Sequence, residues 1–413
     1  MSRFNAILLV FVSLALAAPA FSADVPPGTT GTPEDIDPAT GLARTTVVRP
    51  LRDAVPPPAP AARAAPAQPP SFGPLSPDAK ASVADVSKPH IALILPLGSP
   101  QLQRVADAVR QGFAAAAEAE GRASTPVVLM SVENDGAAAI EACRRAQAAG
   151  ALLVVTGLTR DGASLISRSD CTRSPVLTLN QPLAADFPGD THPQLYSISL
   201  SLEQEARQAA LLAVSEGWHS AVVITSPTAL SRRVQEAFER EWQRAAGELA
   251  GRITFAGGAE DAPIVKERIA QLSRGDMVFI ALDQLEARLV RPYISGMLPI
   301  YATSMSVDPK AESTVNVDLQ GVRYMDMPWF VQPDHPAVMI YPQPRSPMSV
   351  DHERLYALGI DAFRIASVLV QGDPKKLALD GVTGRITLDG NQFARSLTPA
   401  EIDGGRVIPL KNP

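Results

Sequence analysis

From residue 90 onward, short apolar runs alternate with longer segments in which the apolar positions recur at helical spacing. Residues 90–97 form the first apolar run, typical of a buried strand, and the Ala-rich segment 102–120 has the pattern of a helix. The series continues with segments at 127–132, 137–149, 151–156, 162–168 and 176–180. Strands separated by helices of this length predict a parallel sheet with helices on both faces.

A second series of the same kind follows a strand predicted at 196–200. Its segments are 202–216, 221–225, 229–246, 252–255, 263–273, 277–282 and 299–303. Beyond it lie one long predicted helix, 352–370, and a β-rich tail, 384–410, with turns at 389–390 and 403–405.

Two such series predict an α/β fold with two lobes, each a parallel sheet flanked by helices, enclosing a cleft. We expect the first lobe to comprise residues 89–200 with 345–378, and the second 201–344 with 379–413. The chain of 413 residues is long enough for two such lobes.

The first 22 residues have the order of a secretory signal peptide. Arg3 precedes an apolar run at 6–18, and Ala20 and Ser22 favour cleavage after Ser22. The run is shorter than the ~20 residues of a membrane-spanning helix. We therefore expect export to the periplasm and no integral membrane span in the mature chain. No cysteine stands at the end of this region, so lipid attachment there is not expected.

Residues 23–88 are rich in Pro and Ala and have almost no hydrophobic periodicity. Such a segment buries too little apolar surface to offset its conformational entropy, so it is predicted to be a disordered linker. In polyproline geometry it would reach about 200 Å. A plain spacer and a functional tether are both compatible with this composition.

Composition excludes several classes of function. A net charge of −6 and the absence of a Lys/Arg stripe indicate no nucleic-acid partner. The chain has two cysteines, Cys143 and Cys171. In an oxidising compartment they are a candidate disulfide, which would stabilise the fold by roughly 3–4 kcal/mol. The alternative is two separate buried thiols.

Signatures of catalysis, cofactor binding and metal binding are missing. No pair of the five histidines has the spacing of a helical zinc site, and no G-x-S-x-G motif occurs. Gly157 and Gly162 have the glycine spacing of a phosphate-binding loop, but Ala163 stands where its lysine would be. We therefore predict a protein that is not an enzyme, with no cofactor, metal or catalytic residue.

Polar residues that follow the predicted strands are the candidate ligand-binding residues. In parallel α/β lobes, ligands bind beyond the carboxyl ends of the strands, near helix N-termini. The residues at such positions are Ser99, Thr156, Thr159, Asn180, Gln181, Ser226, Asp283 and Ser304. They would suit a small polar ligand. Alternatively, Ser226 and Asp283 are helix N-caps and Asn180 ends a strand.

Five stretches resemble those of a known family. They are LTLNQP at 177–182, SISLSLEQEA at 197–206, GVRYMDMPW at 321–329, YALGIDAFR at 356–364 and GVTGRITLD at 381–389. In order and spacing they resemble the type I periplasmic binding proteins and, within that group, the penicillin-binding-protein activators. This resemblance implies a two-lobed fold and a protein that regulates peptidoglycan synthesis by binding a synthase or another envelope protein.

The chain also departs from both related groups. Activators usually carry a lipidated cysteine and a helical-repeat domain, whereas the Pro/Ala segment stands in that place here. Amino-acid receptors of this fold place an aromatic and an acidic residue on the cleft loops of the second lobe. Asp283 matches the acid, but no aromatic residue follows either strand. The alternative function is a transporter's solute receptor for an amino acid or another small polar ligand.

Overall fold

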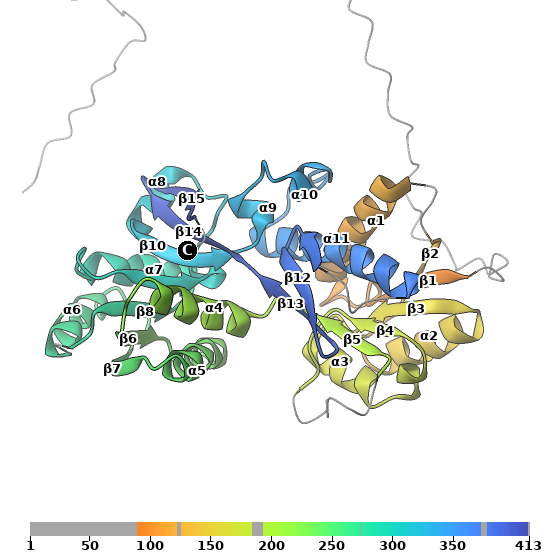
Figure 1. The fold of residues 1–413 in the computed structure, drawn as a ribbon, viewed down its shortest axis with the longest axis horizontal. Helices are drawn as coiled ribbons and strands as arrows, with labels where there is room; N and C mark the ends of the chain where they lie inside the picture. Colours follow the sequence, from red (N-terminus) through yellow and green to blue (C-terminus); the bar gives the residue numbers. More distant parts are fainter. Residues whose placement is uncertain (1–88, 122–124, 184–192, 273, 373–377, 412–413) are drawn as a thin grey trace, which may run out of the picture. The chain divides into compact units, whose positions relative to one another are not determined.

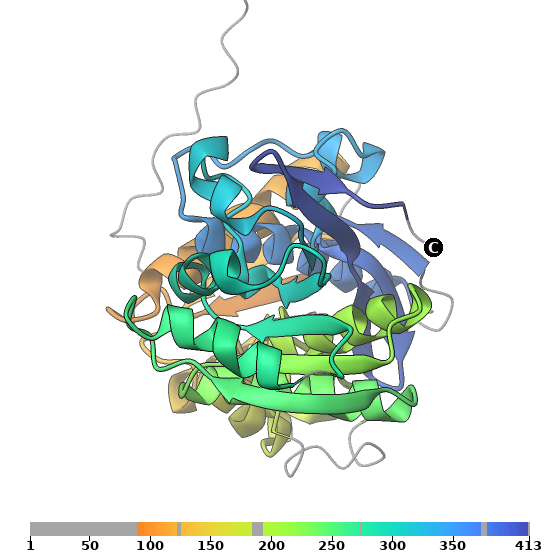
Figure 2. The same ribbon diagram turned by 90° about the vertical axis from the view of Figure 1, so that its left-hand side faces the viewer.

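The computed structural model describes residues 89–121, 125–183, 193–272, 274–372 and 378–411. These residues form two lobes, each built on one mainly parallel sheet with helices packed against both faces (Figures 1 and 2). The predicted signal peptide, 1–22, and the predicted linker, 23–88, lie outside the described residues.

The sheet of the first lobe has eight strands in the order β11-β12-β13-β5-β4-β3-β1-β2. The strands from β2 to β13 in this order are parallel. At the edge beyond them, β12 is antiparallel to β13, and β11 is antiparallel to β12. The strands are β1 (His90–Leu95), β2 (Val127–Ser131), β3 (Ala151–Thr156), β4 (Val176–Thr178), β5 (Leu195–Ile198), β11 (Ala378–Gly381), β12 (Gly384–Asp389) and β13 (Gln392–Ser396).

Alternate residues of these strands pack into two cores, one on each face of the sheet. On β1, Ile91 and Leu93 face the core beneath α1 and α11, whereas Ala92 and Ile94 face the core beneath α2 and α3. A strand buried on both faces reads as a continuous apolar run, as residues 90–97 do. The helices are α1 (Gln103–Glu120), α2 (Ala137–Ala148), α3 (Arg160–Ser167), η2 (Asp170–Arg173) and α11 (Val350–Gln371).

Two glycines allow α1 and α11 to pack closely. A Cβ atom on Gly112 would lie 1.8 Å from the Tyr356 carbonyl oxygen, and one on Gly359 would lie 2.2 Å from that of Val109. Any larger residue would force the helices apart. Beside this contact, the Phe113 and Phe363 rings meet edge to face at 5.2 Å between centroids.

The sheet of the second lobe has seven strands in the order β15-β14-β10-β9-β8-β6-β7. β14 is antiparallel to β10, and β15 is antiparallel to β14. The strands are β6 (Ser220–Thr225), β7 (Glu248–Thr254), β8 (Met277–Ala281), β9 (Ile300–Thr303), β10 (Val322–Asp326), β14 (Thr398–Asp403) and β15 (Arg406–Pro409). The helices are α4 (Leu202–Ser215), α5 (Ala229–Arg244), α6 (Ala262–Gln271), α7 (Gln284–Val290), η4 (Arg291–Tyr293), η5 (Ser304–Ser306), α8 (Ser313–Asn316) and η6 (Val317–Leu319). The short helices α9 (Pro328–Val331) and α10 (Pro336–Met339) follow β10, and their residues Trp329 and Val338 pack in the core of the first lobe.

The second sheet also separates two cores. One core lies beneath α4 and α5, where the Phe238 ring stacks on Phe279 at 3.9 Å and on Trp242 at 5.6 Å between centroids. The other lies on the opposite face, against α6 and α7, and takes the alternate strand residues Val278 and Ile280.

The chain crosses between the lobes three times. It leaves the first sheet after β5 at Ser199, returns after β10 at Met327, and crosses again at Leu397, where β13 leads directly into β14 (Figure 1).

These crossings correct the predicted boundaries of the second lobe, 201–344 with 379–413. Residues 379–396 belong to the first lobe, because β13 pairs with β5 and carries β12 and β11 with it. Met327 and Trp329 likewise pack in the core of the first lobe. The sequence predicted a β-rich tail over residues 384–410, but such a pattern does not specify which sheet a strand joins.

Candidate functional site at the junction of the lobes

A cluster of buried charged side chains lies where the three crossings meet. Glu205 comes from α4, Asp326 from the end of β10, Arg354 from α11 and Arg395 from β13. Glu205, Asp326 and Arg395 are 5%, 1% and 3% exposed, and the Arg354 side chain is 12% exposed. Charges this deeply buried are tolerated only when they are paired or hydrogen-bonded.

Arg354 connects the first lobe to the strand ends of the second. Its Nη2 atom lies 2.7 Å from Asp326 Oδ2 and also donates to the Ser304 carbonyl oxygen at 3.4 Å. The guanidinium lies over the Phe330 ring, 5.4 Å from its centroid. A helix of one lobe is thereby fixed to β10 and the β9 end of the other.

Arg395 fixes two of the crossings to each other. Its Nε donates to the Ser199 carbonyl oxygen and its Nη1 to that of Thr383, each at 2.9 Å. Thr383 in turn donates from its main-chain nitrogen and its hydroxyl to Asp361 Oδ2, at 2.7 Å and 2.6 Å. A buried carboxylate on α11 therefore organises the turn that accepts Arg395.

Within the cluster, the pKa of the Glu205 carboxyl is shifted toward neutral pH. Its Oε2 accepts from the Ser304 main-chain nitrogen at 2.9 Å. Burial raises the pKa of the Glu205 carboxyl to about 7, and the neighbouring Asp326 adds to the increase. This carboxyl group therefore changes charge near neutral pH, at a point where the lobes are joined.

Ion pairs outside the cluster also join the lobes. Glu203 on α4 accepts from Arg160 of α3 in the first lobe at 3.2 Å, and from Arg233 of α5 at 3.1 Å. On another side, Lys310 of the second lobe pairs with Glu353 of α11, and the Trp329 indole donates to the same carboxylate at 2.9 Å. The junction thus has polar links on more than one side.

The candidate residues after the first-lobe strands are largely engaged within the protein. Thr159 caps α3 by accepting from the Gly162 nitrogen at 2.9 Å, and it donates to the buried carboxylate of Asp135. Asn180 donates to the Leu158 carbonyl oxygen at 3.2 Å, and Gln181 donates to the Gln392 side chain at 2.8 Å.

Ser99 and Thr156 differ from these three. Ser99 is half-buried before α1, and its carbonyl oxygen accepts from the Gln103 nitrogen. Thr156 is fully buried, and its hydroxyl has no hydrogen-bond partner among the described residues.

The second-lobe candidates also have structural roles. Asp283 is exposed and forms a capping box at α7, accepting from the Glu286 nitrogen at 2.9 Å. Ser226 is fully buried and bonds the Ser231 hydroxyl at 2.9 Å. Ser304 joins Glu205 and Arg354 as described. Ligand contact by any of the eight residues stays a prediction, and Thr159 and Asp283 are helix caps.

Sequence reasoning missed the residues that hold the junction together. Glu205 and Asp326 lay within the stretches that carry the family resemblance, but no spacing rule pairs them with Arg354 or Arg395. Asp135 was missed as well. Burial raises the pKa of its carboxyl despite hydrogen bonds from Thr159. A Cβ atom on Gly162 would lie 2.1 Å from Asp135 Oδ2, so glycine is required there.

Cys143 on α2 and Cys171 on η2 are both fully buried and are not bonded to each other covalently. They are hydrogen-bonded neighbours, and this contact together with burial raises the pKa of Cys143. The disulfide between Cys143 and Cys171 stays a prediction.

Two findings bear on other kinds of site. No group of three or more metal-ligating side chains occurs within the part of the chain that the structure describes. Among the same residues, no helix is both long enough and apolar enough to cross a bilayer.

Two mainly parallel sheets, three crossings and a charged junction define a protein of the two-lobed type I periplasmic-binding-protein class. The full-length LpoA of Haemophilus influenzae matches with a TM-score of 0.65 and 23% identity over 78% of this chain and 58% of its own. A "putative branched-chain amino acid ABC transporter" from Chromobacterium violaceum matches with a TM-score of 0.65 and 35% identity over 76% of this chain and all of its own. The predicted fold is confirmed.

Within that class, the chain belongs to the LppC family, described as "LppC putative lipoprotein", which matches residues 79–274 and 264–405. The predicted family resemblance is therefore confirmed. A relative from Photobacterium profundum, named penicillin-binding protein activator LpoA, is 26% identical over 73% of this chain and 53% of its own length. The chain spans about half the length of the curated relatives it matches first.

Proposed function

We propose that this chain is an exported periplasmic protein that activates a penicillin-binding protein by binding it, and that it is not itself an enzyme. The observation that carries this proposal is membership of the LppC family, with curated relatives named as activators. The C-domain of the Haemophilus influenzae protein, described as a regulator of PBP1A, is matched over its whole length. The partner proposed here is a peptidoglycan synthase of that kind.

The junction supports a scaffold more than a receptor. A receptor opens and closes about its crossings, and its cleft presents free donors to the ligand. Here Arg354 and Arg395 fix the crossings through buried hydrogen bonds, and Thr159 and Asp283 are occupied as helix caps. Separating groups of this kind leaves buried charges unpaired, which costs about 3–5 kcal/mol for each pair.

The test is direct binding and stimulation. The purified full chain should bind the purified synthase of the same bacterium and raise its rate of glycan polymerisation or cross-linking. A catalytically inactive synthase is the matched control, because it should bind without producing polymer. No binding and no stimulation, with both proteins folded and the synthase active alone, would refute the proposal.

A solute receptor is the second candidate, favoured by the 35% identity to the Chromobacterium violaceum chain. Thermal melting with a library of amino acids and small metabolites distinguishes the two functions. A receptor should be stabilised by one ligand, and Asn180→Ala or Asp283→Ala should weaken that ligand about ten- to a hundred-fold. Asp389→Ala, an exposed acid on β12, is the control. A ligand with this behaviour would refute the activator proposal and support the receptor function.

A further inference from the structure

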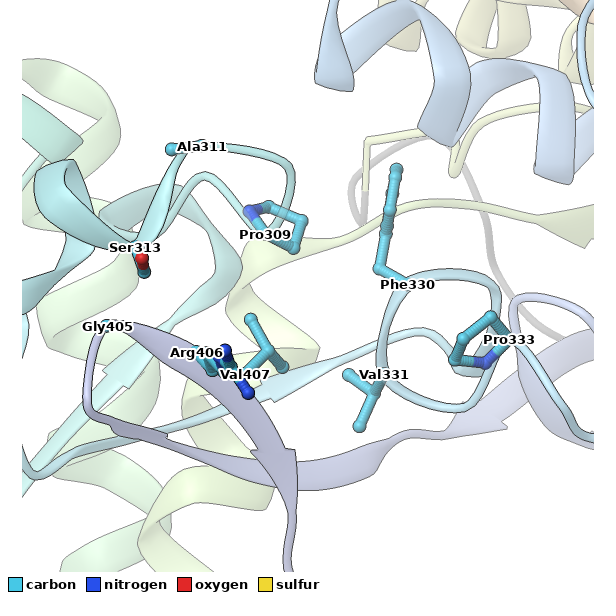
Figure 3. A pocket seen from close by; sticks show the side chains of 9 residues that line it. All are labelled: Pro309, Ala311, Ser313, Phe330, Val331, Pro333, Gly405, Arg406 and Val407. Atoms are coloured by element: carbon cyan, nitrogen blue, oxygen red, sulfur yellow. The ribbon is translucent and has the colours of Figure 1, made fainter. Parts of the chain in front are cut away.

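A groove of about 410 Å³ is lined by residues of the second lobe and of the α9 segment that follows β10, and none of the eight candidate ligand residues lines it (Figure 3). Pro309 and Phe330 stand on opposite sides of its opening, and Val407 of β15 lies below Pro309 (Figure 3). The complete lining is Pro309, Ala311, Ser313, Phe330, Val331, Pro333, Gly405, Arg406 and Val407.

The walls of the groove are held in place before any partner binds. The Phe330 ring is covered by the Arg354 guanidinium, which is itself paired with Asp326. Gly405 has a φ of 72°, and a Cβ atom there would lie 2.0 Å from the Ser313 carbonyl oxygen. The turn before β15 is therefore packed against the opposite wall, and binding would require little ordering.

The floor of the groove is β15, which is an edge strand among the strands that the structure describes. β15 is the last strand of its sheet and pairs with β14 alone among the described strands. Gly404 and Gly405, with φ of 56° and 72°, form the two-residue turn that makes Asp403 and Arg406 a hydrogen-bonded pair.

Alternation along the ladder then determines which groups of β15 face outward. The Leu410 main-chain nitrogen donates to the Pro399 carbonyl oxygen at 2.8 Å, so the main-chain N–H and C=O groups of residues 406, 408 and 410 face β14. The N–H and C=O of Val407 point away from the sheet, whereas Pro409, the next outward position, has no N–H. Pairing with another strand is thus limited to a short stretch around Val407, which prevents open-ended sheet growth.

One charge marks the edge of the groove. Arg406 is exposed and forms no ion pair with any described residue, whereas Lys310 on the opposite side is paired with Glu353. Ile408, 43% exposed, adds an apolar surface next to Arg406 on the same strand. The complementary partner is an extended segment with an acidic side chain and apolar neighbours.

We propose that this groove binds an extended segment of the protein partner, which pairs with β15 at Val407 and places a carboxylate on Arg406. The inference rests on the proposed function, because it supplies the contact through which the penicillin-binding protein is held. Strand addition to a sheet edge, with side chains seated in a neighbouring groove, is an established way to bind peptides.

Two variants test the groove in the full chain, with the purified synthase as the probe. Arg406→Glu reverses the charge, and Val407→Pro removes the outward N–H without breaking the β14 ladder. Each should weaken binding about ten- to a hundred-fold. Arg385→Glu, an exposed arginine on β12 of the other lobe, is the matched control and should change binding less than about two-fold. Melting temperatures of all variants should match the wild type.

Hydrogen exchange gives an independent measurement, in which residues 404–410 should gain protection when the synthase is added. Wild-type affinity in both groove variants, with no added protection of β15, would refute binding of the partner at the groove while leaving the proposed function intact. No binding by the wild type would overturn the proposed function and this inference together. Concentration-dependent dimers that Val407→Pro abolishes would assign the groove to a second copy and also overturn the inference.

Discussion

Replacing Glu205 by Gln tests whether the buried carboxyl at the junction opposes folding once it is ionised. Its pKa is about 7 in the folded protein, against an ordinary value of 4.5. Between these values the folded state holds the proton and the unfolded state does not, so wild-type stability falls as the pH rises. At ~1.4 kcal/mol for each pH unit, the total decrease is about 3 kcal/mol.

Gln carries no charge at any pH, and its amide oxygen can still accept from the Ser304 nitrogen. Glu205→Gln should therefore match the wild type at pH 4.5 and exceed its stability by up to about 3 kcal/mol at pH 8. The measurement is urea unfolding followed by tryptophan fluorescence, at several pH values between 4.5 and 8, on both proteins.

Glu203, on the same helix, is a control because its pKa is shifted in the opposite direction. Despite its burial, hydrogen bonds from the main chain and Ser201, together with Arg160, hold the pKa of Glu203 below its usual value. The stability that ionised Glu203 contributes is fully present above the pKa of the unfolded state, and it is lost as the pH falls through the pKa of the folded state. Glu203→Gln should lose less than about 1 kcal/mol at pH 7, because its ion pairs are partly exposed.

The reasoning about Glu205 would be refuted by a difference between Glu205→Gln and the wild type that does not change with pH. A variant that is less stable than the wild type at pH 8 would refute it as well. Either result would mean that Arg354 and Arg395 stabilise the ionised carboxylate at least as much as burial destabilises it.

Four further predictions concern features outside this carboxyl group. Asp361→Ala removes the acceptor of Val382 and Thr383 and should cost about 3–5 kcal/mol in urea unfolding, whereas Asp351→Ala, 91% exposed on the same helix, should cost less than about 0.5 kcal/mol. Mass spectrometry without reductant should show Cys143 linked to Cys171 in periplasmic protein, with reduction lowering stability by roughly 3–4 kcal/mol; two freely alkylated thiols would contradict this. N-terminal sequencing of that protein should begin at Ala23, and limited proteolysis should leave a core that starts near residue 88; an intact Met1, or equal protection of residues 23–88, would contradict these expectations.

The order of strands and helices could be predicted because several buried strands are apolar along most of their length. The run at 277–281, for example, is buried at every position, and the structure places β8 there. The sheet to which the strands of the C-terminal tail belong was harder to predict. Residues 384–396 show alternation and a turn signal, but β12 and β13 complete the first sheet because β13 pairs with β5, almost two hundred residues earlier. Local pattern carries no information about such a partner.

The junction could not be predicted for a related reason. Arg395 and Ser199 are 196 residues apart, and Arg354 and Asp326 come from different lobes. A charged residue in a single sequence is most simply interpreted as a surface residue. Conversely, Thr159 and Asp283 were recognised as polar residues after strands, and their capping roles follow from the same position, since the strand end is also the helix start.

The direct passage from β13 into β14 has a consequence for how the chain acquires its structure. With a single residue, Leu397, between them, these two strands supply a pairing partner to each sheet, and both come late in the chain. Neither sheet can be completed until residues 392–403 have emerged from the ribosome. Contacts of such high sequence separation form slowly. The proposed export would benefit from that delay, because a polypeptide crosses a membrane pore unfolded and both sheets stay incomplete until β13 and β14 are available.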